Sequence, residues 1–231
     1  MSKTLPERPR RADAVRNRAR LLLAADEVFA ERGLGVTLDD VAHHAGVGVG
    51  TVYRHFPDKD ELIDAVFEQN FSAMADAAEE ATAGDDPWHA FAQYLEFACE
   101  KMAASRGMTE VLYRSGCQRA QAQSHRVEAA VARLVQRAHD SGALRPDAQP
   151  DDFFAIVFSV GALADATRQS NPHVWRRHLA LLLDGLNNDR RPRRPLPAES
   201  PTGPATTRGN AHHAVDRIAA ATAVGASDCG K

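Results

Sequence analysis

The amino-acid sequence predicts an all-α protein, and three observations support this fold class. Apolar residues recur at steps of three and four along most of the chain between Ala12 and Leu186, as on one face of an amphipathic helix. No segment alternates apolar and polar residues convincingly at the two-residue period of a half-buried strand. Glycine, proline and helix-capping residues stand between the helical stretches. We therefore expect helices joined by short turns.

The first two predicted helices open the folded part of the chain. Residues 12–32 form one amphipathic helix, and Gly33 follows it where glycine commonly ends helices. Thr37 then offers an N-cap oxygen, and the two aspartates in the next turn suit the positive end of a helix dipole. These signals predict a short second helix, which Gly46 ends.

A third and a fourth helix follow directly. Gly48 belongs to the turn that leads into a short helix predicted at residues 49–56. Pro57 ends this helix, because proline cannot continue it. Asp58 and Glu61 have the spacing of a capping box and begin a longer fourth helix. The fourth helix is expected to run towards the next glycine-containing turn.

The helical pattern continues through the second half of the chain. Turn or cap signals separate further helices, which are predicted at residues 88–105, 109–116, 118–140, 150–169 and 172–186. From residue 187 onward the sequence becomes rich in Pro, Arg, Ser, Thr and Gly, and such a composition cannot bury enough apolar surface to fold. We expect residues 188–231 to be a disordered tail.

Composition and charge exclude several classes of protein. The chain has 231 residues, of which 44% are hydrophobic, and its formal net charge of −3 predicts neither a nucleic-acid partner nor a membrane surface. The three cysteines are widely spaced and lack a C-x-x-C motif, so neither a disulfide framework nor a zinc site is indicated. The first residues lack the apolar core of a signal peptide, and no apolar run is long enough to span a membrane. We expect a cytoplasmic protein.

The charge is nevertheless unevenly distributed. The first twenty residues contain only two acids, and their basic side chains are Lys3, Arg8, Arg10, Arg11, Arg16, Arg18 and Arg20. We expect residues 1–11 to be a basic, flexible arm. Basic arms that precede a DNA-binding unit contact phosphates or a minor groove.

The segment from Ala45 to Phe56 contains three glycines at alternate positions, which raises the question of a phosphate-binding loop. A dinucleotide-binding fingerprint needs G-x-G-x-x-G after a buried strand, whereas this segment has G-x-G-x-G after a helical stretch, and no Gly-Lys-Ser/Thr follows. The alternative is a helix–turn–helix, whose crossing requires the small residues that Ala42, Ala45 and Gly50 supply. The third helix then presents small, hydroxyl, guanidinium and imidazole groups suited to a major groove.

The sequence TLDDVAHHAGVGVGTVYRHFPDKDEL, from Thr37 to Leu62, resembles the DNA-binding signature of the TetR family of transcriptional regulators. The resemblance covers about 50 residues once the preceding helix is included. It implies that Thr37 caps the second helix and touches phosphate, and that Lys59 contacts phosphate. The residues that it implies face the DNA are Gly48, Val49, Gly50, Thr51, Tyr53, Arg54 and His55.

Physical chemistry agrees with several of these roles. Thr37, Tyr53 and Lys59 carry donors suited to phosphate oxygens, and Arg54 can read guanine with two hydrogen bonds. Gly48 stands where the family often has Ser or Thr, so one side-chain contact to the cap or to phosphate is lost. His43 and His44 are neighbours on a helix and diverge by about 100 degrees, so they do not chelate a metal together. We expect no metal site, no cofactor and no catalytic residues.

The resemblance implies a helical effector-binding and dimerisation domain at residues 59–187, after a helix–turn–helix domain at residues 12–58. Residues 62–170 are rich in aromatic, Met and Cys side chains, which suggest an apolar or aromatic effector. The candidates to line its site are Phe67, Phe71, Met74, Trp88, Phe91, Tyr94, Phe97, Met102, Met108, Tyr113, Cys117 and His125. Tyr94, Tyr113 and His125 are the candidate polar anchors.

The last two predicted helices are apolar on more than one side, which one domain core cannot easily cover. Family resemblance implies that they pair with their two-fold mates in a four-helix bundle. The candidate interface residues are Phe154, Val157, Phe158, Gly161, Trp175, Leu179, Leu182 and Leu183. Two recognition helices of such a homodimer would lie roughly one DNA turn apart and read a palindromic operator.

These expectations combine into a ligand-responsive transcriptional regulator, a repressor that a small effector releases from DNA. A DNA-binding activator or architectural protein without an effector is the alternative, and absence of a cavity would favour it. A helical enzyme that carries a helix–turn–helix is a further alternative, but the sequence contains no paired-carboxylate, Ser/His/Asp or metal-spaced set to support it.

Overall fold

The computed structural model describes residues 8–111 and 117–188, with side chains described from residue 14 onward. Its helices are α1 Arg8–Arg32, α2 Leu38–Ala45, α3 Val49–His55, α4 Lys59–Ala81, α5 Pro87–Ala104, α6 Arg106–Val111, α7 Gln118–Asp140, α8 Pro150–Thr167 and α9 Val174–Leu186. The described residues form no sheet, apart from one isolated bridge between Leu144 and Asn187. The predicted all-α fold class is confirmed.

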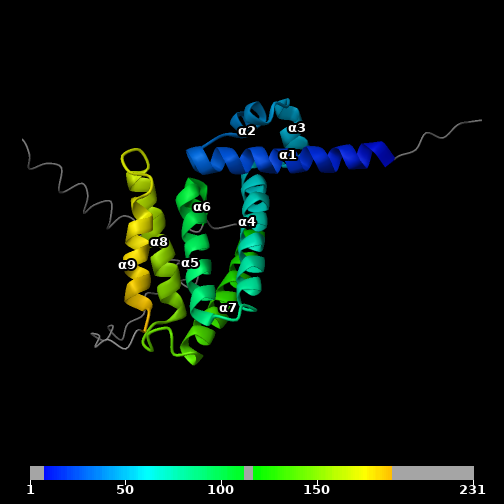
Figure 1. Cartoon of the computed structure of the whole chain (residues 1–231). Coiled ribbons are helices and arrows are strands. Elements are labelled where there is room, and N and C mark those ends of the chain that lie inside the picture. The colour runs from blue at the N-terminus through cyan, green and yellow to red at the C-terminus, as the bar shows by residue number, and fades with distance from the viewer. Residues whose placement is uncertain (1–7, 112–116, 189–231) are drawn as a thin grey trace, which may run out of the picture.

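Helix α1 lies across one end of the molecule, with α2 and α3 on its outer side (Figure 1). Helices α4 to α9 extend away from α1 on the opposite side, and α4 packs along α7 while α5 packs along α8. Helix α9 lies against α8 at the edge of this bundle. The helix–turn–helix unit therefore projects from one end of a larger helical domain.

The turn into α2 forms as its sequence predicts. The Thr37 hydroxyl oxygen accepts a hydrogen bond from the Asp40 backbone nitrogen at 3.2 Å, and the Thr37 nitrogen donates to Asp40 Oδ2 at 2.8 Å. Arg32 also donates to Asp40, at 2.9 Å. These interactions, those of Thr37 first, hold the pKa of Asp40 well below its ordinary value. The capping box thus joins the ends of α1 and α2.

The turn between α2 and α3 depends on a glycine with left-handed backbone geometry. Gly46 has a φ of +65°, and its N–H bonds to the carbonyl oxygens of the last turn of α2. Gly48 is the N-cap of α3 and supplies no side-chain hydrogen bond. Both roles agree with the predictions from the sequence.

Several boundaries differ from their predicted positions. Helix α1 begins at Arg8 rather than Ala12, so residues 8–11 of the predicted flexible arm are helical, whereas residues 1–7 lie outside the described part of the chain. Helix α6 begins three residues before its predicted start, because the Ser105 hydroxyl accepts a hydrogen bond from the Met108 nitrogen at 3.2 Å. The predicted tail at 189–231 is also outside the described residues.

One hydrophobic core connects the helix–turn–helix unit to the bundle. The rings of Phe29 in α1 and Phe67 in α4 stack with centroids 6.2 Å apart, and both side chains are fully buried. Gly107, which stands between the helices predicted at residues 88–105 and 109–116, lies within α6 instead. A Cβ atom at Gly107 would lie 3.1 Å from Cβ of Phe29 and 3.1 Å from Cζ of Phe67, so glycine lets α6 approach α1 and α4 closely.

Candidate DNA-binding surface and effector region

Helix α3 lies at the outer end of the molecule (Figure 1), and several of its side chains are exposed. Val49 is 40% exposed and Tyr53 is 53% exposed, and Arg54 is also exposed. Thr51 and His55 are half-buried. Large side chains held out in solvent on a short helix are suited to a partner surface such as a DNA groove.

The opposite side of α3 belongs to the core. Val52 and Phe56 are fully buried, as expected for the inner face of an amphipathic helix, and Val47 is partly buried against the same cluster. This burial fixes which face of α3 points outward. The side chains predicted to contact DNA therefore share the outer face or its margins.

Gly50 does not have the packing role that we predicted. No atom lies within 4 Å of the position that a Cβ atom would take at Gly50, whereas Ala42 is buried at the crossing. The small residue is therefore not needed for the approach of α2 to α3. Because glycine has no side chain, no group projects from the exposed surface of α3 at this position near its N-terminus.

Two of the three predicted phosphate donors, Thr37 and Lys59, lie outside α3. Thr37 is exposed and caps α2, with its hydroxyl donating to Asp40 Oδ2 at 2.7 Å. Lys59 is half-buried at the first position of α4, after Asp58, whose carboxylate accepts from the Glu61 nitrogen at 2.8 Å. The capping role of Thr37 is confirmed, and the phosphate contacts of both residues stay predictions.

Two arginines of α1 support the helix–turn–helix unit, which the sequence pattern did not reveal. The guanidinium carbon of Arg18 lies 5.1 Å from the centroid of the Phe56 ring. Arg20 donates to the carbonyl oxygen of Ala45 at 3.2 Å, at the negative end of the α2 dipole. His44, one of the adjacent histidines in α2, pairs with Glu27 of α1 at 2.7 Å.

The predicted effector residues fall into three groups. Most of them are core residues with at most 6% exposure, namely Phe67, Phe71, Met74, Phe91, Tyr94, Met102, Met108 and Cys117, while Trp88 and Phe97 are half-buried. Tyr113 lies outside the described residues. His125 does not join this buried set, because its side chain is 68% exposed and pairs with Glu128 at 3.2 Å on the surface of α7.

The aromatic side chains of α5 form a cluster with Phe153 of α8. The ring centroids of Tyr94 and Phe153 lie 5.6 Å apart in a stacked arrangement, and those of Trp88 and Phe91 lie 5.9 Å apart. The Tyr94 hydroxyl donates to the Met74 carbonyl oxygen at 3.1 Å, and burial raises the pKa of Tyr94. Its hydroxyl is thus already used within the protein and is a poor polar anchor for a ligand.

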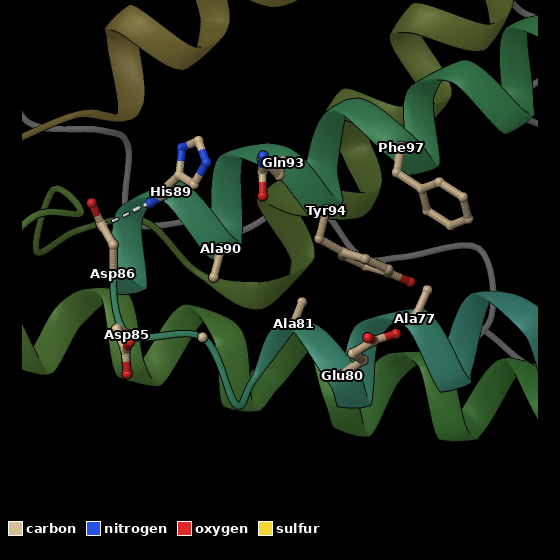
Figure 2. Close-up of a pocket in the computed structure, with 11 residues that line it drawn as sticks. Ala77, Glu80, Ala81, Asp85, Asp86, His89, Ala90, Gln93, Tyr94 and Phe97 are labelled. Carbon is tan, nitrogen blue, oxygen red and sulfur yellow. Dashed lines mark hydrogen bonds between the residues drawn. The ribbon is translucent and has the colours of Figure 1, made fainter.

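A pocket of about 330 Å³ lies between the end of α4 and the beginning of α5 (Figure 2). It is lined by Ala77, Glu80, Ala81, Gly84, Asp85, Asp86, His89, Ala90, Gln93, Tyr94 and Phe97. Only Tyr94 and Phe97 belong to the predicted effector set. The sequence pattern indicated a turn at residues 83–87 but not that its acids border a pocket.

The predicted interface residues of α8 and α9 divide between core and surface. Val157, Gly161, Trp175 and Leu179 were predicted to contact a partner, but they are buried within the chain and expose little surface to one. Gly161 faces α5, because a Cβ atom there would lie 3.4 Å from Cβ of Met102. Phe154, Phe158, Leu182 and Leu183 are half-buried, and Leu181, which was not predicted, is 61% exposed.

A buried carboxylate fastens α4 to the beginning of α7. Asp64 is 8% exposed, and its two oxygens accept hydrogen bonds at 2.9 Å from the Ala120 nitrogen and from Arg119 Nε. Arg119 also pairs with Glu61 at 3.0 Å. These acids, Asp64 first, raise the pKa of Arg119. Sequence patterns do not reveal this link, because its partners lie far apart along the chain.

No helix in the described ranges 8–111 and 117–188 is long and apolar enough to cross a membrane. The same residues contain no group of three or more His, Cys, Asp or Glu side chains arranged to hold a metal ion.

Both halves of the chain match families of regulators. Residues 21–66 match the family described as bacterial regulatory proteins, tetR family, and residues 86–188 match that described as transcriptional regulator SbtR-like, C-terminal domain. The HTH-type transcriptional repressor BepR of Brucella suis biovar 1 is 33% identical over 96 residues, which are 40% of this chain and 46% of BepR. The chain thus spans less than half of the length of this curated relative.

Solved structures share most of the fold. A TetR transcription regulatory protein from Mycobacterium vanbaalenii is 33% identical with a TM-score of 0.57, and the match covers 78% of this chain and 99% of that protein. The TetR transcriptional regulator SCO0520 from Streptomyces coelicolor is 28% identical with a TM-score of 0.55, over 74% of this chain and 98% of that protein. The shared region includes both the helix–turn–helix unit and the helical bundle.

Proposed function

This chain belongs to the TetR family of DNA-binding transcriptional regulators, and we propose that it is a homodimeric repressor that a small effector releases from a palindromic operator. The observation that carries the proposal is the exposed outer face of α3, with Tyr53 and Arg54 in solvent above a fully buried Val52. A short helix held in this way can enter a major groove without rearranging the core.

The proposed division of labour on DNA follows from side-chain chemistry. Arg54 reads a base edge, because a guanidinium can donate two parallel hydrogen bonds to guanine. Thr37, Tyr53 and Lys59 bind phosphates and set the orientation of α3. Gly50 allows the N-terminal part of α3 to lie close to the groove.

Dimerisation would involve the apolar surface that α8 and α9 leave uncovered. Leu181 is 61% exposed, and Phe158 and Leu182 are half-buried. Apolar side chains on an outer pair of helices favour a second copy that packs as a four-helix bundle. A two-fold axis through that bundle would place two copies of α3 on one side of the DNA, roughly 34–36 Å apart.

Effector control would act through the bundle. An effector that prefers a conformation with mis-spaced α3 helices lowers the affinity for DNA, and DNA lowers the affinity for the effector by the same factor. Helix α4 connects Lys59 with the pocket beside Ala77, and α6 packs directly on α1. BepR is described as a repressor, which supports the proposed sign of regulation.

The proposal is tested by selecting bound fragments from the genome of the source organism with the purified chain and footprinting the enriched sequence. We expect an inverted repeat protected by one dimer, and light scattering that gives twice the mass of 25.1 kDa in solution. A monomer in solution and on DNA would contradict the dimer. Protection without sequence preference would favour an architectural protein. Activation of transcription from the protected site would contradict the proposed role as a repressor.

A further inference from the structure

The pocket between α4 and α5 exists because small side chains face each other there. Ala77 and Ala81 of α4 lie opposite Ala90 of α5 (Figure 2). Larger side chains at these positions would fill the gap between the two helices. The remaining space of about 330 Å³ lies at the lower end of the range for small-molecule sites.

Aromatic rings form one wall of this pocket. Tyr94 is 3% exposed, and its hydroxyl is bonded to the Met74 carbonyl, so the ring itself is the part that borders the space. Phe97 lies one turn further along α5, with its ring centroid 6.0 Å from that of Tyr94. Such a wall favours a flat or apolar ligand body, and the faces of aromatic rings attract cations.

The rim of the pocket carries negative charge. Glu80, Asp85 and Asp86 line it, and Asp86 also caps α5 by accepting from the His89 nitrogen at 3.0 Å. Among the described residues, neither Glu80 nor Asp85 has an ion-pair partner within 4.0 Å. These two carboxylates are therefore available to a ligand.

The neighbouring cations do not neutralise this rim. None of the residues that line the pocket is a lysine or an arginine. Arg137 of α7 donates to the backbone carbonyls of Thr82 and Gly84. Lys101 lies with Nζ 5.5 Å from the centroid of the Phe97 ring, a cation–π distance, rather than in an ion pair with the rim carboxylates.

We propose that this pocket binds an organic cation with a flat aromatic or apolar body, held between the Tyr94 and Phe97 rings and the carboxylates of Glu80 and Asp85. The chemistry of recognition rests on the pocket alone. Its consequence for transcription rests on the proposed function, in which such a cation is the effector. The pocket adjoins the last turns of α4, and Lys59 is the first residue of the same helix. An occupant that displaces the end of α4 would therefore also shift Lys59.

The test is isothermal titration calorimetry of the full chain, without DNA, using thioflavin T as the aromatic cation. The matched probe is 2-(4-dimethylaminophenyl)-6-methylbenzothiazole, an uncharged analogue that lacks only the ring N-methyl group. We expect the cation to bind roughly fivefold more tightly than its neutral analogue, and more weakly as salt is raised. Equal affinities, or no heat with either probe, would overturn the proposal.

Two variants and a control locate the site. Glu80→Gln combined with Asp85→Asn should remove the preference for the cation, and Ala81→Leu should block both probes by filling the pocket. Glu96→Gln removes an exposed carboxylate from α5, which also borders the pocket, but at a position outside the pocket, and it should leave both affinities unchanged. Unchanged binding in the double variant and in Ala81→Leu would overturn the assignment of the pocket.

A second readout separates this proposal from the proposed function. Fluorescence anisotropy of labelled operator DNA is measured with and without saturating thioflavin T. A lower affinity for DNA in the wild type, but not in Ala81→Leu, supports the pocket as the effector site. Specific DNA binding that is unaffected by a cation bound in the pocket would overturn the effector role, while the DNA-binding function would stand.

Discussion

The backbone nitrogen of Leu34 donates a hydrogen bond of 2.6 Å to a carboxylate oxygen of Glu110, which joins the turn after α1 to helix α6. The turn begins at Gly33, whose φ of +72° lies in the left-handed region. Helix α6 belongs to the bundle, whereas this turn leads into α2. The hydrogen bond is thus a direct polar link between the helical bundle and the helix–turn–helix unit.

Replacing Glu110 by Ala should lower the free energy of unfolding by about 1 kcal/mol, because the Leu34 N–H loses its partner. Glu110→Gln keeps an oxygen acceptor of similar reach and should lose less. Urea denaturation of the wild type and both variants measures the difference. Equal losses for Ala and Gln would show that the charge, rather than the acceptor, stabilises the turn.

Gly33→Ala should destabilise the chain for two separable reasons. Alanine is strained at a φ of +72°, by about 1–2 kcal/mol, and its Cβ atom would collide with the Glu110 carboxylate. Because Glu110→Ala removes the collision, the double variant should be more stable than the sum of the two single losses predicts. Strictly additive losses in a double-mutant cycle would refute the close contact between these residues.

The link between α4 and α7 should depend strongly on a single carboxylate. Asp64→Asn leaves one oxygen for the Ala120 nitrogen but removes the charge that binds Arg119, so we expect about 2 kcal/mol less stability. Asp76→Asn is the matched control, because Asp76 joins the same two helices through Arg126 but is 65% exposed, and its loss should be below about 1 kcal/mol. Chemical denaturation that ranks Asp76 above Asp64 would contradict the assigned role.

Acid should weaken the start of α2 through Asp40. Its folded-state pKa is depressed, so its contribution to stability is present above the ordinary aspartate pKa of about 4 and is lost as pH falls through the lower, folded-state value. Asp40→Asn should therefore be less stable than the wild type at pH 7, and the difference should shrink on acidification. Urea midpoints of both proteins, measured from pH 7 down to pH 3, test this. A stability difference that widens towards acid would contradict a lowered pKa of Asp40 in the folded state.

Gly50→Ala should separate stability from DNA binding. The position is exposed and helical, and nothing lies within 4 Å of the added Cβ atom, so we expect a gain of about 0.5–1 kcal/mol in the free energy of unfolding. The same methyl group stands on the surface proposed to meet DNA, so operator affinity should fall. A variant that gains stability and binds DNA as well as the wild type would remove Gly50 from the interface.

The features predicted well from the sequence are those that depend on neighbours along the chain. Thr37 caps α2 through a residue three positions on, and Gly46 ends that helix through its own backbone geometry. The burial of Val52 and Phe56 follows from helical periodicity. Local rules were therefore sufficient for the caps and the buried face of the helix–turn–helix unit.

The features that the sequence did not predict depend on which helices meet. A small residue in a helix indicates that another segment packs closely against it, but not which segment. Gly161 was therefore predicted to contact a partner chain, although it faces Met102 of the same chain. His125 has the chemistry of a polar anchor but lies on the outer side of α7. The pocket acids Glu80 and Asp85 were not predicted, because a helix–turn pattern does not show that α4 and α5 leave a gap there.

Base-specific reading by Arg54 is tested by operator binding, measured by fluorescence anisotropy. Wild type and Arg54→Ala are each titrated against the selected operator and against copies with single base pairs inverted. Arg54→Ala should lose about 1–3 kcal/mol and its preference at one position in each half-site, whereas Lys59→Ala should weaken all sequences alike. Arg133→Ala, which removes an exposed arginine from α7, should bind as the wild type does. Equal, sequence-independent losses for Arg54→Ala and Lys59→Ala would contradict the central claim.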